Sequence, residues 1–294
     1  MPTATGSRAR GVVVVPASKA VQVAIVAALL TAAFWGILSS LYGSWFDVRA
    51  YMEHGILVMP AAGYMVWTKR ARIAQIPAKP SMWSIPLLVW GAAQASLGIA
   101  AHWIWVSRTA FLISLVGCIA ALFGLQMVRE LGYPLATLIL MIAPPTFIYE
   151  RLTLSLQLLA SRLGEGILET LGYSVMREGN ILEMVGMKLS VEEACSGIRS
   201  LFAILFVCVL YNYFFVQGNV TRMVILVMAV PMAILGNVGR IVATGIASQR
   251  NVALARGAAH DAFGYASVTL AALGCLVFHL VLVRIRDAWR ARRS

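Results

Sequence analysis

The stretch Glu193-Ala194-Cys195-Ser196-Gly197-Ile198-Arg199-Ser200 places a cysteine among charged residues. It leads directly into an apolar run that extends to residue 217. A hydrocarbon core about 30 Å thick needs roughly 20 apolar residues for one helical crossing, so the run predicts a membrane span. Filling a membrane does not require a thiol between charged residues at the edge of that span. The stretch is therefore both the start of a membrane helix and a candidate site of chemistry.

Similar apolar runs recur along the chain. Of its 294 residues, 60% are hydrophobic and only 12% are charged, well below the roughly 25% charged residues of soluble domains. We predict an all-α, polytopic membrane protein that forms a single integral membrane domain over 1–294, with short cytoplasmic termini at 1–19 and 284–294. The predicted transmembrane helices, about eight, are 20–38, 52–68, 83–101, 109–128, 133–149, 199–217, 223–247 and 262–283.

The distribution of charge predicts the orientation. Basic residues gather in 1–19, in 69–79 and in 284–294, which lie on one side in an eight-span count and so are expected in the cytoplasm. The connection 150–198 holds seven of the twelve acidic residues and is expected outside. We predict a multi-pass protein of the cytoplasmic (inner) membrane with both termini cytoplasmic. The Lys and Arg residues that flank the apolar runs explain the net charge of +12. We therefore expect contact with membrane lipids and no nucleic-acid partner.

The outer connection, between spans five and six, has structure of its own. Leu152, Leu156, Leu159, Leu163 and Ile167 recur at helical spacing, which predicts an interfacial helix along the membrane. Short mixed runs in 175–184 around Gly179-Asn180 predict a small β-hairpin.

Cys195 differs from the other three cysteines. Cys118, Cys208 and Cys275 lie inside apolar runs, where a cysteine is usually a small apolar filler. Without paired spacing the four cysteines indicate no metal site and no disulfide framework, and we expect no cofactor. A free thiol with a pKa near about 8.5 is only a few per cent thiolate at neutral pH, so a catalytic Cys195 needs a lowered pKa.

The sequence around Cys195 predicts how that thiol is activated. Ser190 to Glu193 fits a capping box, which would place Cys195 in an early helical turn where the helix dipole favours an anion. Arg199 follows at i+4 on the same predicted face. The carboxylates of Glu192 and Glu193 act in the opposite direction, because nearby negative charge raises the pKa of a thiol.

Two further ionisable residues are predicted near the same membrane boundary. Arg240 lies toward the outer end of span seven, where it either serves a site or extends to the lipid headgroups. Asn237 precedes it by one turn on the same face, and His260 is just before span eight. The predicted topology thus places a thiol, a guanidinium and an imidazole, the parts needed for nucleophilic acyl transfer, at one boundary.

These residues resemble those of the exosortase family, membrane cysteine transpeptidase-like enzymes related to archaeosortases. The resemblance rests on the 193–200 stretch, on Asn237-x-x-Arg240 and on His260, and it covers mainly 130–283, including Pro144-Pro145. It implies Cys195 as nucleophile with Arg240 and His260 as partners. It also implies substrate proteins with a C-terminal sorting signal: a Pro-Glu-Pro type (PEP-CTERM-like) motif, a membrane helix and a basic end.

The chemistry assigns attack on the scissile carbonyl to Cys195, protonation of the leaving amine to His260 and oxyanion stabilisation to Arg240, with Arg199 as the rival for this last role. Glu193 either orients His260 or Arg240 or caps the helix. Asn237 either holds Arg240 or packs against another polar group. The resulting thioester would pass to a cell-surface or exopolysaccharide acceptor, or to water, and the sequence does not identify which.

The alternative is a small transporter or lipid-binding membrane protein in which Arg240 and His260 line a permeation path. That function predicts polar residues through the depth of several spans. Here the polar candidates gather at one boundary, which favours the enzyme.

Overall fold

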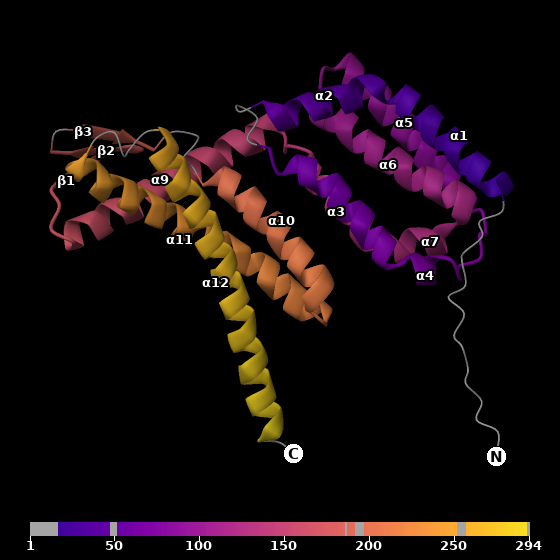
Figure 1. Cartoon of the computed structure of the whole chain (residues 1–294). Coiled ribbons are helices and arrows are strands. Elements are labelled where there is room, and N and C mark those ends of the chain that lie inside the picture. Colours follow the sequence, from indigo (N-terminus) through magenta and orange to yellow (C-terminus); the bar gives the residue numbers. More distant parts are fainter. Residues whose placement is uncertain (1–16, 48–51, 186, 192–196, 252–256, 293–294) are drawn as a thin grey trace. The chain divides into compact units, whose positions relative to one another are not determined.

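The computed structural model describes residues 17–47, 52–185, 187–191, 197–251 and 257–292. Within these residues the chain consists of helices and one small sheet (Figure 1). Packing divides the chain into two compact units: unit 1 combines 1–42 with 60–139, and unit 2 combines 43–59 with 140–294. The single domain predicted from the sequence stays a prediction, because a division by packing does not decide whether the units fold independently.

Unit 1 contains the N-terminal helices. They are α1 (Ala17–Ala33), most of α2 (Trp35–Phe46), most of α3 (Gly55–Thr68), α4 (Arg70–Ile73), α5 (Ser84–Ala100), α6 (Ile104–Phe123), α7 (Leu125–Glu130) and α8 (Gly132–Thr137). The short 3-10 helix η2 (Leu138–Met141) follows, and unit 2 continues with α9 (Thr146–Thr170), β1 (Val175–Glu178), β2 (Ile181–Met184), β3 (Met187–Ser190), α10 (Ile198–Phe215), α11 (Asn219–Arg250) and α12 (Gly257–Ala291).

The helices confirm a polytopic membrane protein. Among the described residues, four stretches are long and apolar enough to cross a membrane: α6, α10, α11 and residues 261–291 of α12. The number rises to six if each of two bent helix pairs is one span. The shorter apolar helices α3 and α5 coincide with the predicted spans 52–68 and 83–101. The total of eight crossings stays a prediction.

Two predicted spans are not straight helices. Span 20–38 breaks at Phe34, where α1 and α2 meet at 73°, and the ring of Phe34 packs edge-on against Phe111. Span 133–149 is wrong as one helix, because α8 and η2 are followed by α9 at an angle of 76°. The break falls at Pro144-Pro145, since a proline lacks a backbone N–H and disfavours helical geometry in the residue before it.

Unit 1 is held together by small residues and a few polar contacts. Gly98 of α5 faces Ser107 of α6 so closely that an added Cβ would lie 2.7 Å from the Ser107 nitrogen. Gln94 of α5 donates to the Thr109 hydroxyl at 2.8 Å. Small residues let membrane helices approach, and side-chain hydrogen bonds then join them. At the other end of the unit, Glu130 pairs with the predicted cytoplasmic connection 69–79.

The helices of unit 2 pack around two apolar clusters. The cluster between α10, α11 and α12 includes Ile204, Ile225 and Ala271. The other cluster joins α9, the sheet and α11, with Leu168, Leu182, Val191 and Ile241 buried at its centre. The part of the connection 150–198 that the structure describes is therefore packed against the long apolar helix α11.

Helix α9 exposes several of its leucines and buries several small residues, although Leu168 is buried in the cluster. Leu152, Leu159 and Ile167 are exposed, whereas Ser161 and Gly164 are buried, Gly164 facing Ile241 of α11. An exposed apolar face on a packed helix suits contact with lipid, as an interfacial helix requires. The predicted β-hairpin is present as β1 and β2, and β3 extends it to a three-stranded antiparallel sheet.

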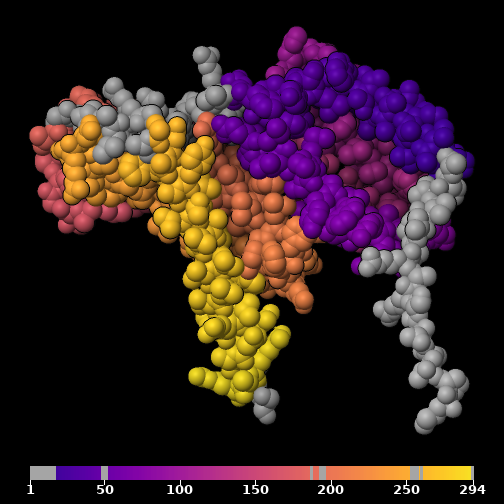
Figure 2. Space-filling view, in the orientation of Figure 1, coloured from indigo at the N-terminus to yellow at the C-terminus, as the bar shows by residue number. Residues whose placement is uncertain are grey.

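The C-terminal segment predicted at 284–294 is helical as far as Ala291, because α12 continues without a break. Figure 2 shows the C-terminal half of α12 extending beyond α10 and α11 of the same unit. Its last two turns are exposed and carry Arg284, Arg286 and Arg290. Such an exposed basic end suits a cytoplasmic helix terminus.

The predicted topology can be tested by labelling. Single cysteines at Glu178, in the sheet, and at Arg250, at the end of α11, should react with a membrane-impermeant thiol reagent in intact cells. Single cysteines at Ala71 and Ala291 should react only after permeabilisation, because their basic neighbours place them in the cytoplasm. All four positions are exposed.

The background for this experiment has each native cysteine replaced by alanine. Glu178 is preferable to the adjacent Gly179, whose φ of +63° disfavours any other residue. If Glu178 and Arg250 label from opposite sides, the segments carrying Cys195 and His260 lie across the membrane from each other. The catalytic assignment is then wrong.

Candidate functional site

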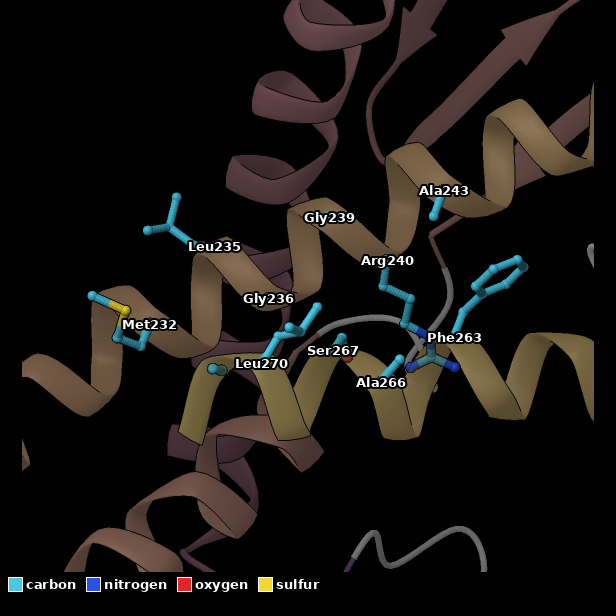
Figure 3. Close-up of a pocket in the computed structure, with 11 residues that line it drawn as sticks. Met232, Leu235, Gly236, Gly239, Arg240, Ala243, Phe263, Ala266, Ser267 and Leu270 are labelled. Atoms are coloured by element: carbon cyan, nitrogen blue, oxygen red, sulfur yellow. The ribbon is translucent and has the colours of Figure 1, made fainter. Parts of the chain in front are cut away.

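Arg240 lies buried between two helices of unit 2. It is 9% exposed on α11, and its guanidinium extends toward α12 beside Phe263 and Ala266 (Figure 3). A Cβ added to Gly264 would lie 3.2 Å from Cζ and 3.3 Å from Nη2 of Arg240. The guanidinium therefore occupies the space that a side chain at position 264 would take.

His260 is in the first turn of α12, one helical turn before Gly264. Positions four residues apart share a helix face. Position 260 is thus on the same face of α12 as Gly264, against which the guanidinium of Arg240 lies. The side chain of His260 itself lies outside the described residues.

Asn237 joins α11 to the Cys195 stretch. Its side chain is buried against Gly197, where an added Cβ would lie 3.1 Å from the Asn237 amide nitrogen. Gly197 caps α10 with φ of +79° and ψ of −10°, a left-handed conformation that favours glycine. One turn of α11, from Asn237 to Arg240, therefore contacts both the N-terminus of α10 and the first turns of α12.

Cys195 and Glu193 lie outside the described residues, as does most of the predicted capping box. The prediction that Arg199 shares a helical face with Cys195 is wrong, because the left-handed Gly197 interrupts any helix between them. The described helix starts at Ile198, so Cys195 precedes it by three residues.

Arg199 is engaged by a residue that the sequence analysis missed. Its Nη2 lies 3.0 Å from Oε1 of Glu53, and the two side chains are 35% and 47% exposed. Exposed ion pairs of this kind contribute roughly 0–1 kcal/mol. The main effect of the pair is on the orientation of Arg199, because the Glu53 carboxylate already binds one nitrogen of its guanidinium. An acidic residue at the start of the apolar run 52–68 was the signal that could have indicated Glu53.

The segment 43–59 is tied to unit 2 at several points. Trp45 donates its indole N–H to the Met141 carbonyl at 3.1 Å. The ring of His54 lies 3.1 Å from the Leu140 carbonyl and stacks on Phe202 of α10. These contacts position Glu53 beside the N-terminus of α10.

A cavity of about 310 Å³ extends from Arg240 along α11 and α12. Its walls are mostly apolar and include Met232, Leu235 and Leu270, with Arg240 the single charged residue among them (Figure 3). A Cβ at Gly236 would lie 2.8 Å from the Ser267 carbonyl oxygen, so glycine is needed for the helices to approach beside the cavity. The site thus combines an apolar groove with one buried cation.

Fold and site together define a polytopic helical membrane protein with a buried arginine near the N-termini of two helices. A family model described as transmembrane exosortase (Exosortase_EpsH) matches residues 45–278. Since this range covers most of the chain, the chain belongs to the transmembrane exosortase family, which makes it a membrane sorting enzyme. No curated protein and no solved structure matches it.

The match adds to the resemblance found in the sequence. It starts at residue 45, whereas the recognised motifs covered mainly 130–283. The additional part contains the segment 45–59, which belongs to unit 2 together with Arg240 and Gly197.

The position of the Arg240 guanidinium depends on the absence of a side chain at 264. We expect Gly264→Val to lower sorting of a co-expressed tagged substrate by at least about tenfold, because misplacing a catalytic group by about 1 Å can reduce a rate by about 100-fold. The size shift of the substrate on a gel measures this. The matched control is Gly166→Val on α9, where an added Cβ meets no atom within 4 Å. Equal activity of the two variants would contradict the assignment.

Proposed function

We propose that the chain is a membrane-embedded cysteine transpeptidase that cleaves C-terminal sorting signals of exported proteins through a thioacyl intermediate. One observation carries the proposal: a single turn of α11 contacts Gly197, two residues after Cys195, and Gly264, one turn after His260. Three segments distant in sequence therefore converge where a thiol, a guanidinium and an imidazole would be needed.

In the first step, the Cys195 thiolate attacks the carbonyl carbon of the scissile peptide bond. A C–S bond forms, and the carbonyl electron pair moves onto oxygen to give a tetrahedral oxyanion. The carbonyl re-forms as the carbon–nitrogen bond breaks, and His260, holding the proton that the Cys195 thiol released, gives it to the leaving amine. The products are a thioester on Cys195 and the released C-terminal peptide.

Arg240 is the better oxyanion donor of the two arginines. It is buried and lines an apolar cavity, and in such surroundings a fixed donor stabilises developing charge more strongly than in water. Arg199 is partly exposed and already bound to Glu53. We therefore assign Arg199 to positioning of the α10 N-terminus through Glu53.

Asn237 and Glu193 are proposed as supporting residues. The contact of Asn237 with Gly197 favours a role in holding the Cys195 stretch against α11. Glu193 precedes Cys195 by two residues. Its proposed role is either to orient His260 or Arg240 or to cap the helix. For the substrate proteins we propose, from the family, a PEP-CTERM-like sorting signal of three parts: the motif, a membrane helix and a basic end.

In the second step, an amine, a hydroxyl or water attacks the thioester carbon, and the C–S bond breaks to restore the thiol. The proposed acceptor is a cell-surface or exopolysaccharide group, on the extracytoplasmic side of the inner membrane. Membership of the exosortase family favours this enzyme over a transporter or lipid carrier.

The nucleophile can be tested by substitution. We expect Cys195→Ala and Cys195→Ser to abolish processing of a co-expressed tagged sorting-signal protein, because serine lacks the acidity of a thiol. Cys118→Ala, Cys208→Ala and Cys275→Ala should process normally, and all five variants should be found in the membrane fraction. Processing by Cys195→Ala would exclude the cysteine mechanism.

The two arginines should respond differently to the same conservative change. Loss of one oxyanion donor typically reduces a rate by about 10²–10³, and lysine cannot reproduce a planar guanidinium. Arg240→Lys should therefore be nearly inactive. Arg199→Lys should keep measurable activity, because a lysine can still pair with Glu53. The reverse ranking in a processing assay would transfer the oxyanion role to Arg199.

A further inference from the structure

Unit 1 contains a buried arginine that the proposed reaction does not use. Arg108, in the second turn of α6, is only 8% exposed. One nitrogen, Nη2, donates to the carbonyl oxygen of Ser40 at 2.9 Å and to its hydroxyl at 3.0 Å. Its Nε is buried and has no acceptor among the residues that the structure describes. An arginine stays protonated in proteins, so a full positive charge is buried here.

Unit 1 supplies no counter-charge for this guanidinium. By sequence, its one acidic residue is Glu130. Both oxygens of Glu130 are engaged, one with Lys69 at 3.0 Å and one with Arg72 at 3.1 Å. Buried charges in proteins are normally paired. The unit therefore leaves Arg108 with neutral acceptors on one side and an unused donor on the other.

Arg108 faces an open cavity of about 350 Å³ where α1 and α2 bend apart. The lining includes Gly36, Ser40, Ile99, His102, Ile104 and Arg108. Ile99 and Ile104 are 60% and 59% exposed, so the cavity opens on an apolar surface. A Cβ added to Gly36 would meet no atom within 4 Å, which shows room beside this residue.

Tryptophans around the cavity indicate its depth in the membrane. Trp35 precedes Gly36, and Trp103 lies between His102 and Ile104. Their side chains are 67% and 68% exposed. Exposed tryptophans gather at the headgroup level of a bilayer, where an amphipathic ring has both apolar and polar surroundings. We therefore expect the cavity at the level where lipid phosphates lie.

We infer that this cavity binds an anionic phospholipid, whose phosphate pairs with Arg108 and whose upper acyl chain lies along Ile99 and Ile104. A phosphate matches the fork of guanidinium donors and supplies the missing negative charge. A free phosphate would satisfy the cation but not the apolar walls. The site is separate from the residues assigned to catalysis, all of which belong to unit 2.

The test uses the purified full chain in a neutral detergent and follows the midpoint of thermal unfolding. The three probes are dihexanoyl-phosphatidylglycerol, dihexanoyl-phosphatidylcholine and inorganic phosphate. At about 100-fold excess over Kd we expect the anionic lipid to raise the midpoint by roughly 5–10 °C. Phosphatidylcholine and inorganic phosphate should raise it much less.

Two variants distinguish the contribution of the Arg108 charge from that of the cavity volume. Arg108→Gln removes the cation, and Gly36→Leu fills the cavity while keeping the cation. Both should abolish the response to the anionic lipid. Arg129→Gln, which removes an exposed cation of the same unit, should keep it.

The proposal is overturned if the native chain does not respond to phosphatidylglycerol, or if inorganic phosphate or phosphatidylcholine gives an equal rise. It is also overturned if Gly36→Leu responds like the native chain. Because Gly36→Leu leaves Arg108 in place, the test still decides the matter if Arg108→Gln does not fold. None of these measurements depends on sorting activity.

Discussion

The close approach of α11 and α12 is the constraint on which the candidate site depends. Positions 236 and 264 carry no side chain, so Gly236 lies close to the Ser267 carbonyl and the Arg240 guanidinium fits against Gly264. A long cationic side chain can be buried in an apolar helix pair only if space is reserved for it. The same spacing leaves the cavity beside Arg240, whose walls are mostly apolar, so that a fixed charge acts more strongly there than in water.

The N-terminus of α10 is held from two directions. Asn237 packs on Gly197 from α11, and Glu53 binds Arg199 from the segment 43–59. That segment is itself anchored through Trp45 and His54. Gly197 and the first turn of α10 are thus held in place, and such support is what the nucleophile that we propose two residues earlier in the chain requires.

Two buried arginines illustrate different uses of the same side chain. Arg240 lies against Gly264 in the first turns of α12, one turn of α11 after Asn237, which packs on Gly197 at the start of α10. Arg108, on α6, binds Ser40 of α2, and the one carboxylate of its unit, Glu130, is bound to Lys69 and Arg72. Each occupies an open apolar cavity. What distinguishes them is the chemistry of their neighbours, from which we propose a reaction for the first and lipid binding for the second.

Hydrophobic runs and charge placement were sufficient to predict a polytopic helical protein, because a membrane helix must satisfy its backbone within itself and carry an apolar surface. The Cys195 stretch, Asn237-x-x-Arg240 and His260 were sufficient to indicate the family that the match over residues 45–278 then confirmed. The bends at Phe34 and at Pro144-Pro145 were not predicted, since a window of hydropathy does not register a change of direction. Only the tertiary structure decided that Arg199 pairs with Glu53 and that Arg240 lies against Gly264. These contacts join residues far apart in sequence, and their partners follow from the packing of helices, which no local pattern records.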